Sequence, residues 1–344
     1  MTPAFLLGAV LLFSLVAYAL LAGADFGGGI WDLLASGPRR AEQRRLVEHA
    51  IGPIWEANHV WLILAVVVLF TGFPAAFAAV SVTLFLPLVL LLIGIVLRGA
   101  AFTFRTYGRG DRLARSFGAV FSSASVVAPL LLGVSVGALA SGRLRVDPAG
   151  APRSGELAAF SPFTFAVGLL ACALFAFLAA SYLTVEAEGE LREDFRRRAL
   201  AAGVAVFATA ALALALARSE APRLFEGLTG HLWSAALHLL TAVAALSAFG
   251  ALYARRPRLG RLCAAAQVAL IVLGWGAAQY PYLVVPDVTL LGAQGPPQTQ
   301  VALLVALAVG ALTLFPSLYL LFRVFKGERP FSILERRPAQ RPPP

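Results

Sequence analysis

The chain has 344 residues, of which 59% are hydrophobic and only 13% are charged. Soluble domains carry about 25% charged residues, so this composition excludes a protein built for water and indicates an integral membrane protein. The formal net charge of +10 does not indicate a nucleic-acid partner, because the basic residues lie in short loops between apolar runs, where they act as topology signals.

The apolar runs predict an all-α polytopic membrane protein. A helix needs roughly 20 apolar residues to cross a bilayer, and these runs are solidly apolar, whereas the strands of a membrane barrel would alternate. Nine spans are predicted, near residues 4–26, 53–72, 77–101, 116–140, 162–186, 199–217, 230–254, 262–284 and 300–325. The helix of the first span is expected to continue to about residue 34.

The first span ends in the stretch GADFGGGIWD, residues 23–32, where Asp25 follows a run without any charge. A charged side chain in the bilayer is costly, which makes Asp25 a functional candidate. Asp32 is expected to be interfacial and solvated. The three glycines 27–29 have two interpretations: they permit close approach of neighbouring helices, which we favour, or they unwind the helix and expose its carbonyls.

The second span opens with GPIWEANHVWLI, residues 52–63, and places Glu56 in its first turns. His59 shares a helix face with Trp55, four residues away, and neighbours Glu56, three residues away. Asp25 and Glu56 are both expected near the cytoplasmic side, where two carboxylates suit a proton entry path.

Five further residues are candidates to support this path: Asn58, His59, Trp55, Trp61 and Arg98. Asn58 and His59 could hold water in line with the carboxylates, and Trp55 and Trp61 flank them. The alternatives are structural: Glu56 favours the positive end of the helix dipole, and Trp55, Trp61 and Trp31 belong to the interfacial aromatic belt.

Arg98, near the cytoplasmic end of the third span, either snorkels to the interface or pairs with an intramembrane carboxylate. The histidines are His49, His59, His231 and His238. A haem needs His or Met as axial ligand, and Met1 is the only methionine. Polar residues satisfied within helix interfaces are favoured over haem ligation by this chain, and no metal site is predicted.

The basic residues predict the orientation. Of the 28 Lys and Arg residues, 22 lie in the loops 34–50, 102–115, 187–198 and 255–261 or in the C-terminal tail, whereas 5 lie on the other side. The positive-inside rule then places the N-terminus outside and the C-terminus in the cytoplasm. Spans 1–4 and 5–8 look weakly alike, which suggests a parallel repeat. The tail 336–344 (RRPAQRPPP) is expected to be disordered.

Several stretches together resemble a known family, subunit II of the cytochrome bd-type quinol oxidases, including its cyanide-insensitive branch. They are GADFGGGIWDLL (23–34), IGPIWEANHVWLI (51–63), LRGAAFTFR (97–105), GEL (189–191), YPYLVVP (280–286) and FPSLYLLFRVFKG (315–327). They occur in the family's order and cover the chain nearly end to end.

The resemblance implies an accessory subunit of a quinol:O₂ oxidoreductase in the bacterial cytoplasmic membrane. Haems b and d are then expected in a homologous subunit I, often with a small single-helix subunit, and quinol and lipids are further partners. The implied fold has two pseudo-symmetric four-helix bundles, residues 1–140 and 162–284, and a peripheral ninth helix, 300–325. A structural quinone occurs in subunit II of some members.

The resemblance also implies residue roles. Asp25 matches the first-span aspartate of the family, and Glu56 matches a second-span acidic position that is Asp in some members; both are associated with proton delivery. Two other functions remain open from the residues alone: a proton-coupled secondary transporter, suggested by the repeat and the intramembrane acids, and haem binding by this chain through His59, His231 and His238.

Overall fold

Apolar helices make up most of the computed structural model, which describes residues 2–52, 55–107, 111–147 and 153–326. Within these residues nine helices are long and apolar enough to cross a membrane, which confirms the predicted polytopic all-α class. They are α1 (Pro3–Leu33), α3 (Trp55–Gly72), α5 (Phe85–Tyr107), α6 (Asp111–Ser141), α7 (Pro162–Glu186), α8 (Gly189–Glu220), α10 (Leu232–Tyr253), α11 (Pro257–Gln279) and α12 (Pro297–Lys326).

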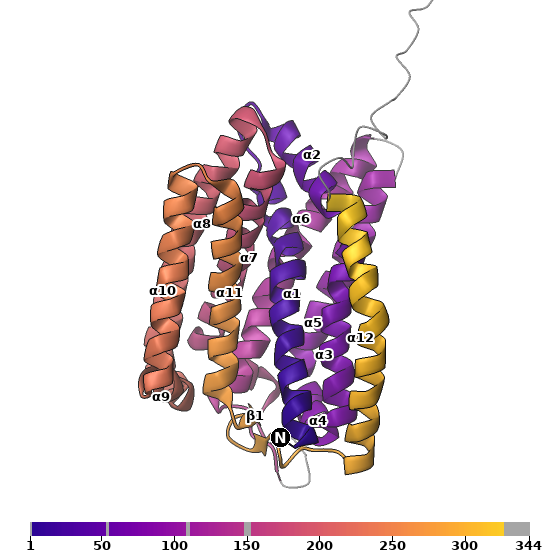
Figure 1. The fold of residues 1–344 in the computed structure, drawn as a ribbon, viewed down its shortest axis with the longest axis vertical. Helices are drawn as coiled ribbons and strands as arrows, with labels where there is room; N and C mark the ends of the chain where they lie inside the picture. Colours follow the sequence, from indigo (N-terminus) through magenta and orange to yellow (C-terminus); the bar gives the residue numbers. More distant parts are fainter. Residues whose placement is uncertain (1, 53–54, 108–110, 148–152, 327–344) are drawn as a thin grey trace, which may run out of the picture.

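Short elements connect the spans. They are α2 (Arg40–Ile51), α4 (Pro74–Thr83), the 3₁₀ turn η1 (Glu156–Ala159), α9 (Pro222–Thr229), and the antiparallel strands β1 (Tyr282–Val284) and β2 (Val288–Thr289). The long helices run side by side (Figure 1). The N-terminus, α4, α9 and β1 lie at one end of the bundle, and α2 lies at the other.

Two predicted spans are not continuous helices in the structure. The apolar run 77–101 was expected to be one helix, but it divides into α4 and α5 at Leu84. The run 262–284 was expected to be helical throughout, but α11 ends at Gln279 and the chain continues into β1. Pro281 explains this second end, because proline lacks the N–H and clashes with the preceding turn of a helix.

All four predicted basic loops, 34–50, 102–115, 187–198 and 255–261, contain helical residues. The basic segment 34–50 holds most of α2, and residues 189–198 form the first turns of α8. The first span does continue beyond the bilayer-length run, since α1 reaches Leu33. The predicted start at Pro53 and the tail 336–344 lie outside the described residues.

Helix α7 forms the centre of the molecule. It packs against α8, α6, α1 and α11, and two thirds of its most apolar stretch is buried. Helix α12 lies at the edge of the bundle against α1 and α3 (Figure 1), and its most apolar stretch has no buried residue. Helix α7 belongs to the predicted second bundle, but it contacts α1 and α6 of the predicted first bundle. The division into bundles 1–140 and 162–284 therefore stays a prediction.

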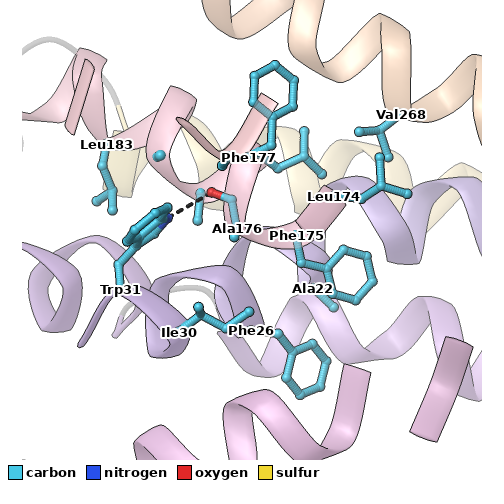
Figure 2. Packing of buried hydrophobic residues seen from close by; sticks show 14 of the residues in the cluster. Ala22, Phe26, Ile30, Trp31, Leu174, Phe175, Ala176, Phe177, Leu183 and Val268 are labelled. Atoms are coloured by element: carbon cyan, nitrogen blue, oxygen red, sulfur yellow. Dashed lines mark hydrogen bonds between the residues drawn. The ribbon is translucent and has the colours of Figure 1, made fainter. Parts of the chain in front are cut away.

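Side-chain packing and one buried hydrogen bond stabilise the contact between α1 and α7. Trp31 donates its indole N–H to the carbonyl oxygen of Ala176 at 2.8 Å (Figure 2), and Phe26 stacks on Phe175 with ring centroids 6.2 Å apart. Apolar burial alone gains little between helices in lipid, so close packing and interhelical hydrogen bonds carry such contacts. Trp31 is thus an interior residue rather than part of an aromatic belt.

Ion pairs join segments distant in sequence at both ends of the bundle. At the α2 end, Arg39 donates two hydrogen bonds to the Asp194 carboxylate, at 2.8 and 2.7 Å, and also contacts Glu190. At the other end, Arg145 donates two hydrogen bonds to Asp287, at 2.8 and 3.1 Å. These pairs tie α8 to the α1–α2 connection, and the β1–β2 turn to the segment after α6.

Candidate functional site

Asp25 lies in the interior of the bundle, on the face of α1 that meets α3. Its side chain is buried, and Asn58 of α3 donates its Nδ2–H to Oδ2 of Asp25 at 2.8 Å. Asn58 is buried as well. A buried carboxylate is costly unless it is hydrogen-bonded or charge-paired, and the Asn58 amide supplies part of that compensation.

Arg98 brings the compensating charge from α5. Its residue exposure is only 1%, and it interacts electrostatically with Asp25. Its Nε–H donates to Ser125 Oγ at 3.1 Å, and its guanidinium lies 4.8 Å and 5.2 Å from the ring centroids of Phe26 and Phe121. Of the two sequence alternatives, snorkelling is wrong, because the guanidinium remains inside the bundle.

His59 extends the cluster along α3. Its Nδ1 lies 3.5 Å from the hydroxyl of Tyr18, and its ring is surrounded by the rings of Tyr18, Phe26 and Trp55 at 5.8–6.1 Å. Among the described residues, His59 Nε2 and Arg98 Nη2 are buried without a hydrogen-bond partner. Buried polar groups of this kind are commonly satisfied by internal water. The interior around Asp25 is therefore polar and suited to hold water.

Glu56 lies apart from this cluster. It is exposed on α3, whereas Asn58, two residues later, points inward, because residues two apart on a helix face nearly opposite sides. Trp55 is partly buried and packs on Phe102 at 6.1 Å, and Trp61 is buried edge-on to Phe13 at 5.5 Å. The structure thus brings Asn58 and Arg98 to Asp25, places His59 against Tyr18 and Phe26, and leaves Glu56 on the surface of the chain.

Asp32 is also buried, which corrects the expectation of a solvated, interfacial residue. Only 1% of the residue is exposed. Its carboxylate accepts a hydrogen bond from Arg105 Nη1 at 2.9 Å and one from Ser122 Oγ at 2.6 Å, and Arg44 lies 3.9 Å away. The seven-residue spacing from Asp25 placed both aspartates on one face of α1, a signal that the sequence analysis missed.

The three glycines let α1 approach three different neighbours. A Cβ on Gly27 would lie 1.9 Å from the backbone oxygen of Phe175 on α7; on Gly28 it would meet Ile51 of α2 at 2.6 Å, and on Gly29 it would meet Ser125 Oγ of α6 at 2.1 Å. Helix α1 runs unbroken through all three. Close helix approach, the favoured interpretation, is confirmed, and local unwinding is wrong.

The remaining histidines lie away from the interior. His49, His231 and His238 are exposed, and His231 and His238 are at the start of α10, where His231 stacks on Trp233. Within the described residues, no group of three or more His, Cys, Asp or Glu side chains is placed to hold a metal ion. His59, surrounded by aromatic rings, is thus the one histidine of the four that is not exposed.

Comparisons with known proteins agree on one family. The family described as cytochrome bd terminal oxidase subunit II matches residues 3–325. The chain is similar to a putative cytochrome bd menaquinol oxidase subunit II of Bacillus subtilis, with 24% identity over 91% of this chain and 92% of that protein.

Two further matches extend this result. A cytochrome bd-I ubiquinol oxidase subunit 2 of Escherichia coli is 28% identical over 58% of this chain and 53% of that protein. The fold matches a chain in the structure of bd oxidase from Geobacillus thermodenitrificans with a TM-score of 0.80 and 23% identity, covering 96% of this chain and all of that one.

Proposed function

The chain belongs to the cytochrome bd terminal oxidase subunit II family, and from this premise we propose that its buried Asp25 cluster delivers protons to the oxygen-reducing centre of the complex. The chain is an accessory subunit of a quinol:O₂ oxidoreductase, a terminal oxidase of a bacterial membrane, and it has a partner, subunit I. This membership favours the oxidase subunit over the secondary transporter.

We assign the oxidation of quinol and the reduction of O₂ to subunit I. Haems b and d would lie in subunit I, because the histidines of this chain are either exposed or enclosed by aromatic rings. Quinol would be oxidised in the membrane by that subunit. A small single-helix subunit and a structural quinone would complete the assembly as in other members of the family.

The proton role of Asp25 is supported by its surroundings. Proton carriers inside a membrane are carboxylates and histidines that face the bundle interior rather than lipid. Asp25 satisfies this condition, and Asn58 orients its carboxylate. Arg98 places a positive charge near the carboxylate, and Asp25 would receive a proton and pass it on. Water bound between His59 Nε2 and Arg98 Nη2 would extend the path.

Glu56 would take part at the boundary of the subunit. It is exposed on α3, two residues before Asn58, so it would exchange protons with water or with the partner rather than directly with Asp25. Trp55 and Trp61, packed on Phe102 and Phe13, would fix the position of α3 and thus of Asn58.

The source of the protons follows from the predicted orientation. The basic loops place the α2 end of the bundle in the cytoplasm, with the N-terminus outside. Asp25 lies on the α2 side of the centre of α1, which spans Pro3–Leu33. Protons would therefore enter from the cytoplasm.

The test uses the complex of this chain with subunit I. Asp25→Asn is expected to lower O₂ consumption by about tenfold or more, because groups that transfer protons in a rate-limiting step contribute about 10²–10⁴. The haem content of the complex should remain normal in reduced-minus-oxidised spectra, and Asp25→Glu should retain more activity than Asp25→Asn.

Glu42→Gln is the matched control, since Glu42 is an exposed carboxylate of α2 outside the cluster, and it should consume O₂ at the normal rate. Normal turnover by Asp25→Asn would remove the proton role. Absence of a haem d band from the unmodified complex would contradict the oxidase function itself, so the two failures are distinguishable.

A further inference from the structure

A pocket lies at the end of the bundle opposite α2, outside the cluster around Asp25. Its volume is about 310 Å³, and its polar lining includes Arg223 and Glu226 of α9, His231 before α10, Gln279 at the end of α11, and Tyr282 of β1. Figure 1 shows α9 and β1 at this end of the bundle. The pocket is thus at the height where the spanning helices end, the depth of lipid headgroups in a bilayer.

Gln279 gives this pocket an unmet hydrogen-bonding requirement. The residue is only 6% exposed. Its Nε2 donates to the carbonyl oxygens of Leu139 and Leu283, at 3.2 and 3.4 Å, and these two acceptors fix which end of the amide is nitrogen. Its Oε1 is then buried with no donor among the described residues. An occupant that brings an N–H or O–H donor to this oxygen would satisfy it.

Arg223 and Glu226 supply opposite charges at the same pocket. They are three residues apart on α9 and so share a face. The guanidinium of Arg223 lies 5.0 Å from the ring centroid of Tyr282, and within the described residues its N–H groups have no acceptor, so they can bind an anion. Guanidinium groups bind phosphate by charge-assisted hydrogen bonds, and a carboxylate such as Glu226 accepts from an ammonium group.

The side chains around the pocket suit the binding of a lipid. Exposed apolar side chains of α10 continue from it toward the middle of the membrane, among them Leu232, which is 91% exposed, and Leu239, which is 66% exposed. Short amphipathic helices such as α9 lie in the plane of the membrane interface. A lipid whose acyl chains pack along α10 would therefore have its headgroup beside α9.

We propose that this pocket binds the headgroup of a zwitterionic phospholipid, with its phosphate on Arg223 and its primary ammonium group between Glu226 and Gln279 Oε1. A primary ammonium provides the N–H donor that Gln279 Oε1 lacks. A quaternary choline group carries the same charge but has no N–H, and an anionic glycerol headgroup offers no cation to Glu226.

The test measures retained lipid by native mass spectrometry on the delipidated oxidase complex. Dioleoylphosphatidylethanolamine is expected to bind about tenfold or more tightly than the corresponding choline and glycerol lipids, the change expected for one hydrogen bond to a charged group. Free phosphoethanolamine distinguishes the sources of this chemistry: binding as tight as that of the lipid would assign the pocket to a soluble headgroup compound instead.

Two exposed pocket residues provide the variants. Arg223→Gln should weaken binding of all phosphate-bearing lipids, and Glu226→Gln should abolish the preference for ethanolamine over choline. Arg218→Gln is the control. Arg218 is exposed near the C-terminal end of α8, at the same end of the bundle as the pocket, but it is not one of the residues that line the pocket. Equal retention of the three lipids by the unmodified complex, or an unchanged preference in both pocket variants, would overturn the proposal.

Discussion

At the scale of single residues, the two aspartates of α1 have different environments and therefore different expected roles. Asp25 has an amide donor and a neighbouring guanidinium with an unpartnered nitrogen. Asp32 is held by Arg105 and Ser122 at 2.9 Å and 2.6 Å. We interpret the first as a site for proton exchange, and the second as a fixed connection among α1, α5 and α6.

This difference predicts that Asp32→Asn affects stability more than turnover. Breaking a buried ion pair by removing one partner costs about 3–5 kcal/mol, and here the cost should lie near the lower end, because Glu48 lies 3.9 Å from Arg105. Thermal unfolding of the purified complex measures the effect. Unchanged thermal stability together with lost O₂ consumption would instead place Asp32 on the proton path.

Gly27 predicts a second stability effect at this scale. A methyl group in Gly27→Ala would lie 1.9 Å from the backbone oxygen of Phe175, and backbone cannot rotate away as a side chain can. The variant should lose about 1–3 kcal/mol, typical of overpacking, or fail to assemble. In the control Gly250→Ala, nothing lies within 4 Å of the added carbon. Equal melting temperatures of both variants would contradict the close α1–α7 approach.

At the scale of elements, the pair of Asp287 and Arg145 predicts a pH dependence. Hydrogen bonds from Arg145, assisted by its charge and by the N–H of Val146, hold the pKa of the Asp287 carboxyl below its usual range despite partial burial. A carboxyl with a lowered folded-state pKa stabilises the fold above its unfolded-state pKa, and this contribution is lost as the pH falls through the folded-state value.

The melting temperature of Asp287→Asn should therefore lie below that of the unmodified chain at pH 7, and the two should converge below about pH 4, the ordinary range of an aspartate pKa. The difference should be small, because Arg145 is 56% exposed and solvent screens the pair. The same difference at both pH values would show that Asp287 acts through packing alone.

The sequence allowed the spans to be predicted, but not their interruptions. Hydropathy detects a run long enough to cross the membrane, and it is insensitive to the break at Leu84, because α4, Leu84 and α5 are equally apolar. The positions of the carboxylates were also only partly predictable. Which of Glu56 and Asn58 faces Asp25 depends on how α3 is rotated against α1, and a single sequence does not contain that rotation.

At the scale of the whole molecule, the orientation predicted by the basic loops can be measured with single cysteines. Ser36 and Ser219 are exposed at opposite ends of the bundle, and both native cysteines lie within membrane helices. A membrane-impermeant maleimide applied to intact cells should label Ser219→Cys and not Ser36→Cys. Both should react in broken cells, and the reverse pattern in intact cells would place the N-terminus inside.

The contact of α1 with α7 has a consequence for biosynthesis. Trp31 and its hydrogen-bond acceptor Ala176 are 145 residues apart, and ribosomes add about 5–20 residues per second. Helix α1 is therefore in the membrane for roughly 7–30 s before α7 is synthesised. During that interval the indole N–H of Trp31 and the close-packing surface at Gly27 are without α7. We therefore expect α2, α3, α5 and α6, or the translocation machinery, to cover the α7-facing side of α1 until α7 is inserted.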